Sequence, residues 1–421
     1  MHSKHAAAKV RIFYGWYIVA AGFLILFCMS GARFSFGVAF KPMIAEFGWD
    51  RSSISLAYLL NMLVFALTLS ISGVFYDRYG PRWVMVIATV ALAVGYLGIA
   101  AMGALWQFMI FYGVLSAVGF GGASLPLIAA LTSKWFDRRR GFAISLAIAG
   151  NCLGQFALVP LFAVFLLRYG WRASYAATGM IVLAVNTILV LGVIKPSPHA
   201  LGQQPWGAQP AGAAGLAQAS RAAPARRPDL KLHEAMRTAS FWFFLTVMFV
   251  CGSGDFLVTT HLIPLVTDYG IAPSTAASML AWFGMASLAG ILIAGPVADR
   301  IGNKIPIAVT FGLRFLLYVM ILRYRNFFTF YVFAATFGFT FLITAPLTTT
   351  LVGKLFGFRH VGLISGFITT IHHLGGGLGA YLGGLIFDHT KSYQLAFVFS
   401  AGLALLAVAS SLFIKERRHC V

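Results

Sequence analysis

Charged residues are scarce in this sequence, and acidic residues are the scarcest of them. Only 10% of the 421 residues are Asp, Glu, Lys or Arg, and just 11 are acidic. Soluble domains carry about 25% charged residues, so this shortage excludes the ordinary soluble globular class. Hydrophobic residues make up 60% of the chain, and the mean hydropathy is +0.85. Most of the chain is therefore expected to lie in an apolar solvent, as an all-α membrane protein.

The sequence also lacks the spacings of disulfide, metal and nucleotide sites. Cys28, Cys152 and Cys251 lie in apolar stretches and are interpreted as small packing residues, while Cys420 has no lipidation spacing. No GxxxxGK[ST] loop occurs, which argues against ATP-driven chemistry, and the glycine-rich 375–384 follows no strand. No nucleophile–base constellation is present. We expect no cofactor, no metal site and no enzymatic activity.

Long apolar runs predict twelve membrane-spanning helices. Each run reaches about the 20 residues needed to cross a bilayer. The predicted spans are 12–40, 52–76, 84–104, 107–133, 141–167, 173–194, 238–267, 274–298, 305–322, 327–353, 361–387 and 393–414.

The net charge of +20 is explained by membrane topology. With the N-terminus inside, most Lys and Arg residues fall in segments on the inner side, as the positive-inside rule requires. The rule predicts that both termini are cytoplasmic, and the basic residues would contact anionic lipid. A nucleic-acid partner is not expected.

A segment rich in Pro, Ala, Gly and Gln separates the sixth and seventh spans. Such a composition cannot bury a core, which predicts a mobile cytoplasmic linker. The predicted organisation is a six-helix bundle over 1–194, a linker over 195–237 and a second six-helix bundle over 238–421. Within the linker, 230–237 has helical spacing and could lie at the membrane interface.

One short charged motif occurs twice, about half the chain length apart. Gly73 begins GVFYDRYGPR and Gly295 begins GPVADRIGNK, and both read G-x3-D-R-x-G-x-[RK]. A duplicated pattern at matching places in a chain of membrane spans indicates two related halves, which is typical of transporters.

These two loops, each between the second and third predicted helix of a half, resemble the signature loops of the major facilitator superfamily. The resemblance covers nearly the whole chain and implies two six-helix bundles around a cavity that opens alternately to each side. It also implies that charged loop residues hold the outward-open state. Glycine would permit close helix approach, and a carboxylate facing guanidinium groups makes a breakable pair. The implied gating residues are Asp77, Arg78, Arg82, Asp299, Arg300 and Lys304.

Several longer stretches resemble bacterial members of the monocarboxylate porter group. They include YGWYIVAAGFLILF, KWFDRRRGFAISLAIAGNCLGQ and HHLGGGLGAYLGGLIFD. This resemblance implies a small organic anion as cargo, commonly moved with a proton. Many of these carriers hold an arginine four residues before the second signature glycine, where this chain has Ile291. A substrate carboxylate cannot be held there by charge.

Ionisable residues inside spans are the leading candidates for a site, because a charge at membrane depth is costly unless it has water or a partner. Arg33 is a candidate clamp for a substrate carboxylate, with snorkelling or structural pairing as the alternative. Asp255 is the one acidic residue deep within a span, and it is a candidate for proton coupling. Its alternative is a permanent ion pair, possibly with Arg33. For Arg314, packing or lipid contact is the favoured interpretation.

Histidines and polar residues complete the predicted site. His261 is a second candidate for proton coupling, and at most one of His372 and His373 is expected to face the cavity squarely. Hydrogen bonds to neighbouring helices would explain the same residues, since such bonds contribute about 0.6–2 kcal/mol. The predicted substrate-binding set is Arg33, Tyr58, Asn61, Asn151, Gln155, His372 and His373.

The sequence therefore predicts a monomeric secondary transporter of the bacterial inner membrane. Its predicted partners are a small organic anion, a proton and membrane lipid. Two alternatives stay open. The 39 phenylalanines are compatible with proton-coupled efflux of an apolar or cationic compound, and a transporter-like sensor is a third possibility.

Overall fold

The computed structural model describes residues 13–207, 230–357 and 360–416, and these residues form helices with no strand. Ten helical segments are long and apolar enough to cross a membrane. The longest, α8 (Arg140–Gly192), changes direction at Gly170 and supplies two crossings. Helix α16 (Val361–Thr390) has 30 residues and lies in the bundle beside them. Within the described residues, this agrees with the twelve predicted spans.

The remaining elements follow the predicted spans closely, and several spans are broken inside. The elements of the first half are α1 (Tyr14–Phe34), α2 (Phe36–Phe47), α3 (Arg51–Tyr79), α4 (Pro81–Ala101), α5 (Leu105–Phe108), the π-helical turn η1 (Met109–Ser116), α6 (Ala117–Gly122) and α7 (Leu125–Ser133). The elements of the second half are α10 (Leu232–Ala235), α11 (Ala239–Asp268), α12 (Pro273–Ile301), α13 (Lys304–Arg323), α14 (Phe327–Phe341), α15 (Thr344–Phe356) and α17 (Gln394–Phe413).

The last glycine of each duplicated motif has nearly the same backbone conformation. Gly80 has φ 83° and ψ 168°, and Gly302 has φ 84° and ψ 173°. This region of backbone space is open essentially to glycine alone. Each glycine ends one helix and allows the next to begin within one or two residues, so the duplicated sequence encodes a duplicated turn.

The first glycine of each motif does not lie against another helix, contrary to our expectation of close helix approach. A Cβ atom built on Gly73 or Gly295 would meet no atom within 4 Å. In this conformation neither glycine lies against another helix, so close helix approach is not what the structure shows at these positions.

Small residues in α16 allow two other helices to approach its backbone. A Cβ on Gly375 or Gly379 would collide with the carbonyl oxygens of Phe249 and Ser253 on α11, and one on Gly384 would collide with Arg51 on α3. Helix α16 therefore packs closely on helices of both halves through small residues.

The start of the linker is folded onto the first half. Residues Pro198–Leu201 form a 3₁₀ turn, η2, and Trp206 exchanges backbone hydrogen bonds with Trp135, Asp137 and Arg138 over distances of 2.9–3.0 Å. For these residues the prediction of a mobile linker is wrong, because an aromatic residue anchors them. Residues 208–229 and Cys420 lie outside the described part of the chain. Helix α10 forms within the predicted 230–237.

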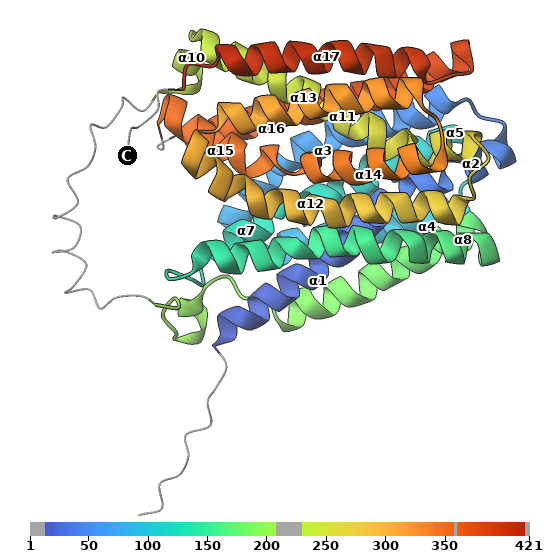
Figure 1. The fold of residues 1–421 in the computed structure, drawn as a ribbon. Coiled ribbons are helices and arrows are strands. Elements are labelled where there is room, and N and C mark those ends of the chain that lie inside the picture. The colour runs from blue at the N-terminus through green and yellow to red at the C-terminus, as the bar shows by residue number, and fades with distance from the viewer. Residues whose placement is uncertain (1–12, 208–229, 358–359, 417–421) are drawn as a thin grey trace, which may run out of the picture.

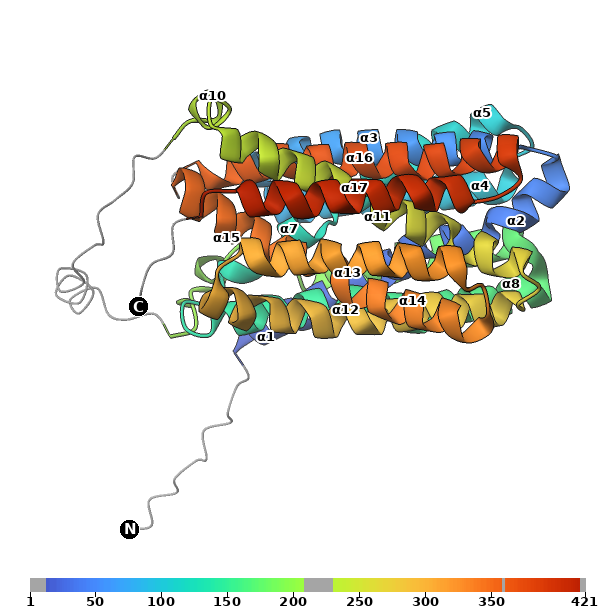
Figure 2. The same cartoon turned by 45° about the horizontal axis from the view of Figure 1, so that its top comes forward.

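The helices lie roughly along one direction, and two ends of the bundle can be distinguished (Figures 1 and 2). We call the end that carries Tyr14, Gly192 and Phe413 the linker end, and the end that carries Phe47, Asp268 and Thr390 the far end. In Figure 1, α1 and α8 of the first half lie below α12, α13 and α17 of the second half, whereas α3 lies among the helices of the second half. Helices α2, α3 and α8 of the first half contact α11, α16 and α12 of the second.

Candidate functional site

A buried ion pair joins α11 and α13. Arg314 Nη2 lies 2.7 Å from Asp255 Oδ1, and the two side chains are only 1% and 2% exposed. The contact is close but lacks hydrogen-bond alignment, so Asp255 Oδ1 has no hydrogen-bond donor within the described residues. Asp255 therefore has a structural partner, as one of our alternatives held, but that partner is Arg314 and not Arg33.

Arg314 is held by contacts from two other helices, α11 and α14. Its Nε atom donates to Thr340 Oγ1 at 3.0 Å, Nη2 donates to the Thr340 carbonyl at 3.1 Å, and Nη1 lies 3.7 Å from Cys251 Sγ. The guanidinium also lies 4.6 Å from the centre of the Phe337 ring. Lipid contact is therefore the wrong interpretation of Arg314.

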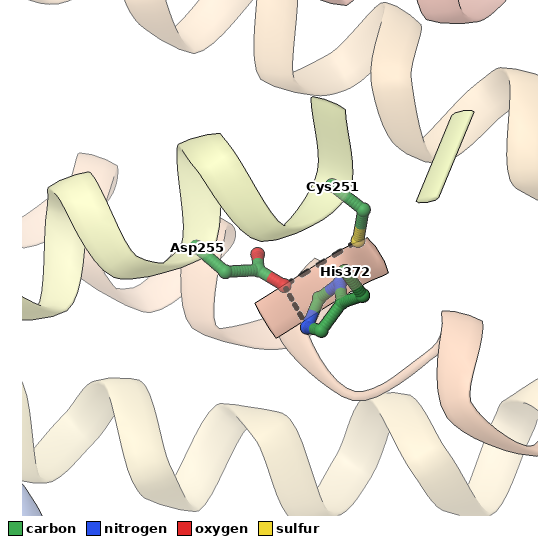
Figure 3. A group of neighbouring side chains, drawn as sticks. All are labelled: Cys251, Asp255 and His372. Atoms are coloured by element: carbon green, nitrogen blue, oxygen red, sulfur yellow. Dashed lines mark hydrogen bonds and ion pairs between the residues drawn. The ribbon is translucent and has the colours of Figure 1, made fainter. Parts of the chain in front are cut away.

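Cys251 and His372 complete this cluster around Asp255 (Figure 3). Asp255 Oδ2 lies 3.4 Å from Cys251 Sγ and 3.9 Å from His372 Nε2. The side chain of His372 is 15% exposed, against 2% for Asp255, so the imidazole is the more accessible of the two groups. Gly252 brings α16 close at this point, because a Cβ there would collide with the His372 carbonyl.

The atoms of Cys251, Asp255 and His372 lie within 4.8 Å of one another, as metal ligands can. A divalent cation held there would lie against the guanidinium of Arg314, which already approaches Asp255 to 2.7 Å. Like charges in a buried site repel strongly. We therefore interpret the cluster as an ion pair with an attached imidazole and thiol.

Arg33 lies in a different environment, among aromatic rings. Its guanidinium carbon is 4.3 Å from the centre of the Phe65 ring and 5.6 Å from those of Phe120 and Phe256. Its Nη2 atom lies 3.5 Å from Met62 Sδ. Within the described residues, no carboxylate pairs with this half-buried guanidinium. Arg33 is therefore a cation without a counter-ion at the boundary between the halves.

The histidines of α16 connect Arg33's surroundings to the Asp255 cluster. The His373 ring lies 4.7 Å from Phe65 and 5.7 Å from Phe256, and the His372 ring lies 5.7 Å from Phe256. His373 Nδ1 faces the Thr369 carbonyl of its own helix at 2.8 Å. His372 thus lies beside Asp255, whereas His373 lies beside Phe65.

The other predicted substrate-binding residues divide into two groups. The Tyr58 hydroxyl interacts with Arg33, Thr259 and Thr260, which places it at the boundary between the halves. Asn61 instead donates to the Tyr112 carbonyl at 2.6 Å and to Ser116 at 3.1 Å, so it fastens α3 to η1.

The predicted pair on α8 also lies toward the second half. Gln155 is buried, and its Nε2 atom donates to the Leu280 carbonyl of α12 at 3.1 Å. Asn151 is half-buried on the same helix. Gln155 is therefore a contact between the two halves.

His261 is tied down by both ring nitrogens. Nδ1 lies 3.0 Å from the Tyr393 hydroxyl, and Nε2 lies 2.8 Å from the Ala380 carbonyl. The ring is buried, and a Cβ on Gly383 would approach it closely. This placement favours a packing role over the predicted proton coupling.

The charged residues of the signature loops contact helix ends within their own half. Arg82 donates to the carbonyls of Val190 and Leu191 at the end of α8. Asp77, Arg78 and Arg300 are exposed, and the side chain of Asp299 lies outside the described residues.

In the second half, Glu416 occupies the start of α13. Its carboxylate accepts from the backbone of Asn303 at 2.8 Å and of Lys304 at 2.9 Å, and it lies 3.3 Å from Lys354 Nζ. The Lys304 side chain reaches the Leu412 carbonyl at 3.5 Å. A carboxylate at a helix N-terminus is stabilised by the helix dipole. The gating roles themselves stay predictions.

Charged contacts between the halves gather at the far end. Asp268 of α11 lies 2.6 Å from Lys41 Nζ and 2.9 Å from Arg51 Nη1. Asp388 of α16 accepts from the backbone N–H groups of Arg51 and Ser52 at 3.1 and 2.7 Å, which caps α3. We call these five residues the far-end network. At the linker end, no hydrogen bond or ion pair described here joins the halves.

Sequence reasoning missed the far-end network and the roles of Cys251 and Met62. Asp268 and Arg51 are separated by 217 positions, and nothing in either local sequence marks the other as a partner. The one available signal is that Lys41 and Arg51 lie between the first and second predicted spans, on the side opposite the N-terminus.

Comparison with known proteins agrees with this geometry. The family model described as Major Facilitator Superfamily matches residues 22–267 and 243–419. An MFS-type transporter of Bacillus subtilis, YcxA, is 26% identical, covering 96% of this chain and 98% of the relative. Monocarboxylate transporter 13 of Bos taurus is 25% identical, covering 97% and 90%.

Solved structures show the same fold. The structure of a bacterial homologue of the human lysosomal transporter Spinster superposes with a TM-score of 0.75 at 14% identity, covering 98% of this chain and 100% of the other. The duplicated turn, the two halves and the family match over nearly the whole chain lead to one conclusion: the protein belongs to the major facilitator superfamily.

Proposed function

We propose that this chain is a secondary transporter that carries a small monocarboxylate, or a related organic anion, together with a proton by alternating access. The proposed location is the bacterial inner membrane, with both termini and the linker end in the cytoplasm. The observation that carries the proposal is that Arg33 has no counter-ion among the described residues and is connected through the Phe256 ring to His372, beside the buried pair Asp255–Arg314. Similarity to a monocarboxylate transporter supports the class of cargo.

Arg33 is proposed to bind the carboxylate. A guanidinium that lacks an anionic partner can form two parallel hydrogen bonds with a carboxylate, and burial strengthens their attraction. The contacts of Arg33 with rings, a thioether and the Tyr58 hydroxyl do not neutralise its charge, so it can still bind an anion. Because Ile291 replaces the arginine found in many related carriers, Arg33 would supply the missing charge.

Asp255 is proposed to take up the proton, with His372 as the route to it. His372 Nε2 lies 3.9 Å from the carboxylate and is the more exposed group, so a proton can pass from water to imidazole and then to Asp255. Protonation removes one charge from the buried pair and releases Arg314 from its ionic partner. Arg314 then keeps its charge and its hydrogen bonds to Thr340. Binding of the carboxylate neutralises Arg33, so the anion and the proton together leave the net charge of the site unchanged.

The far-end network is proposed to close the external side in this conformation. Asp268 and Asp388 hold the first residues of α3 and Lys41 of α2 from the opposite half. Alternating access requires these contacts to separate in each cycle. Their partial exposure, 26% for Asp268 and 34% for Lys41, keeps the cost of separation small.

Efflux of an apolar compound is the second candidate. The rings of Phe65, Phe120 and Phe256 favour it, because they offer an apolar surface between the halves. A cationic cargo is disfavoured, because it would have to lie beside Arg33.

The test is proton movement in proteoliposomes after a panel of carboxylates is added outside, with protein-free vesicles as the control for passive entry of the acids. Carrier-dependent external alkalinisation with at least one acid is expected, and Arg33→Gln should abolish it. If folded protein produces no external alkalinisation with any acid of the panel, proton-coupled uptake is refuted and efflux of an apolar compound is favoured.

A further inference from the structure

Apart from the Tyr58 hydroxyl, the contacts of the Arg33 guanidinium are mainly aromatic. Three rings and a thioether contact its guanidinium, and they come from α3, α6 and α11, which belong to both halves. Phe65, Phe120 and Phe256 are buried, with exposures of 5%, 3% and 4%. A ligand held by Arg33 therefore keeps its carboxylate against a charge and its body against aromatic surface.

The aromatic surface extends past Arg33 onto α16. The ring of His373 lies 4.7 Å from that of Phe65 and 5.7 Å from that of Phe256. Aromatic groups at these separations attract one another beyond simple burial, through edge-to-face and offset contacts. A planar ring in the ligand could join this cluster, whereas a hydroxylated aliphatic chain would exchange hydrogen bonds to water for contacts with rings.

The charges present at the boundary favour an acid with a single carboxylate. Arg314, the other arginine within a predicted span, is already held by Asp255 and Thr340. A second carboxylate would have to displace Asp255 from Arg314 or remain unpaired in a buried site, and both are costly.

We propose that the preferred cargo is an aryl monocarboxylate, an acid whose carboxylate binds Arg33 and whose ring packs against Phe65, Phe120 and Phe256. This inference rests on the proposed function and specifies its substrate class. Phe65, the ring closest to the guanidinium, is the specificity-determining residue.

The test is calorimetric binding to the purified full chain in detergent, which avoids passive membrane entry of weak acids. Benzoate is compared with cyclohexanecarboxylate, which has a similar size without a π system, and with lactate and phthalate. We expect benzoate to bind at least about tenfold more tightly than the other three. Phe65→Leu and Phe120→Leu should each reduce the ratio of benzoate affinity to lactate affinity to about threefold or less. Phe333→Leu, at a buried ring within the second half, should preserve the preference.

The outcomes separate this inference from the proposed function. If lactate binds as tightly as benzoate and Arg33→Gln abolishes binding of both, the aryl preference is overturned and the carboxylate site stands. If the preference survives in both Phe65→Leu and Phe120→Leu, the rings do not cause it and the inference is also overturned. Cooperative unfolding shows that the purified protein is folded. If no carboxylate binds to such protein, both the aryl preference and the proposed carboxylate transport are refuted.

Discussion

Replacing Asp255 by Asn should destabilise the protein more than replacing Arg314 by Gln, although both changes break the same ion pair. Both side chains are at most 2% exposed, so a charge left alone has no water to solvate it. Removing one partner of a buried pair costs about 3–5 kcal/mol in the free energy of unfolding. The two partners differ in how they can respond to that loss.

A guanidinium does not give up its proton in proteins, so Arg314 must remain charged in Asp255→Asn. It keeps its bonds to Thr340 at 3.0 and 3.1 Å, which offset part of the cost. We expect a loss of about 3 kcal/mol, the lower end of the range for a broken buried pair. In Arg314→Gln, the carboxyl can bind a proton and become neutral, so we expect a loss of about 1–2 kcal/mol, comparable with one unsatisfied polar group.

The double variant Asp255→Asn with Arg314→Gln carries neither charge and should lie within about 1 kcal/mol of the wild type. Unfolding can be followed with a thiol-reactive dye, because Cys28, Cys152 and Cys251 are all buried in the folded chain. Equal destabilisation by the two single variants, or a double variant no more stable than Asp255→Asn, would refute this account of the pair.

Three further predictions concern the ends and turns of the bundle. Asp268→Asn removes both ion pairs of Asp268 across the halves and should move the population toward the outward-open state by up to about fivefold. Glu46→Gln, which breaks a 2.7 Å pair within one half, should leave that population unchanged. Distances between spin labels at the far end measure the population, and equal effects of the two variants would contradict the prediction. Gly80→Ala should lower stability by about 1–3 kcal/mol because Gly80 has a positive φ, while Gly73→Ala should be nearly neutral. If thermal unfolding ranks the two variants the other way, the glycine requirement of the turn at Gly80 is contradicted. His261→Asn should lower stability by about 1–3 kcal/mol but leave the pH profile of transport unchanged, so a shifted profile would restore His261 to the proton path.

The membrane-spanning plan could be predicted from the sequence, because apolar run length measures bilayer crossing directly. The duplicated motif also predicted the division into two halves. The motif is duplicated because the same backbone geometry requires glycine at both Gly80 and Gly302. The linker was less predictable, since a single aromatic residue, Trp206, anchors a segment whose composition favours disorder.

The site was only partly predictable, because hydropathy gives the depth of a residue but not the direction of its side chain. Asp255 and Arg33 were both identified as candidates and a pair between them was one alternative, but the carboxylate of Asp255 pairs with Arg314 on α13 instead. The rings around Arg33 could not be distinguished among 39 phenylalanines, which lie everywhere in an apolar chain.

The central claim is that Asp255, paired with Arg314, carries the proton that accompanies the anion. The most direct test compares carboxylate exchange with carboxylate-driven proton uptake in proteoliposomes containing the wild type or the double variant Asp255→Asn with Arg314→Gln. The account predicts that the wild type performs both, whereas the double variant exchanges carboxylate between the two sides and takes up no proton. Proton uptake by the folded double variant at the wild-type rate would contradict it.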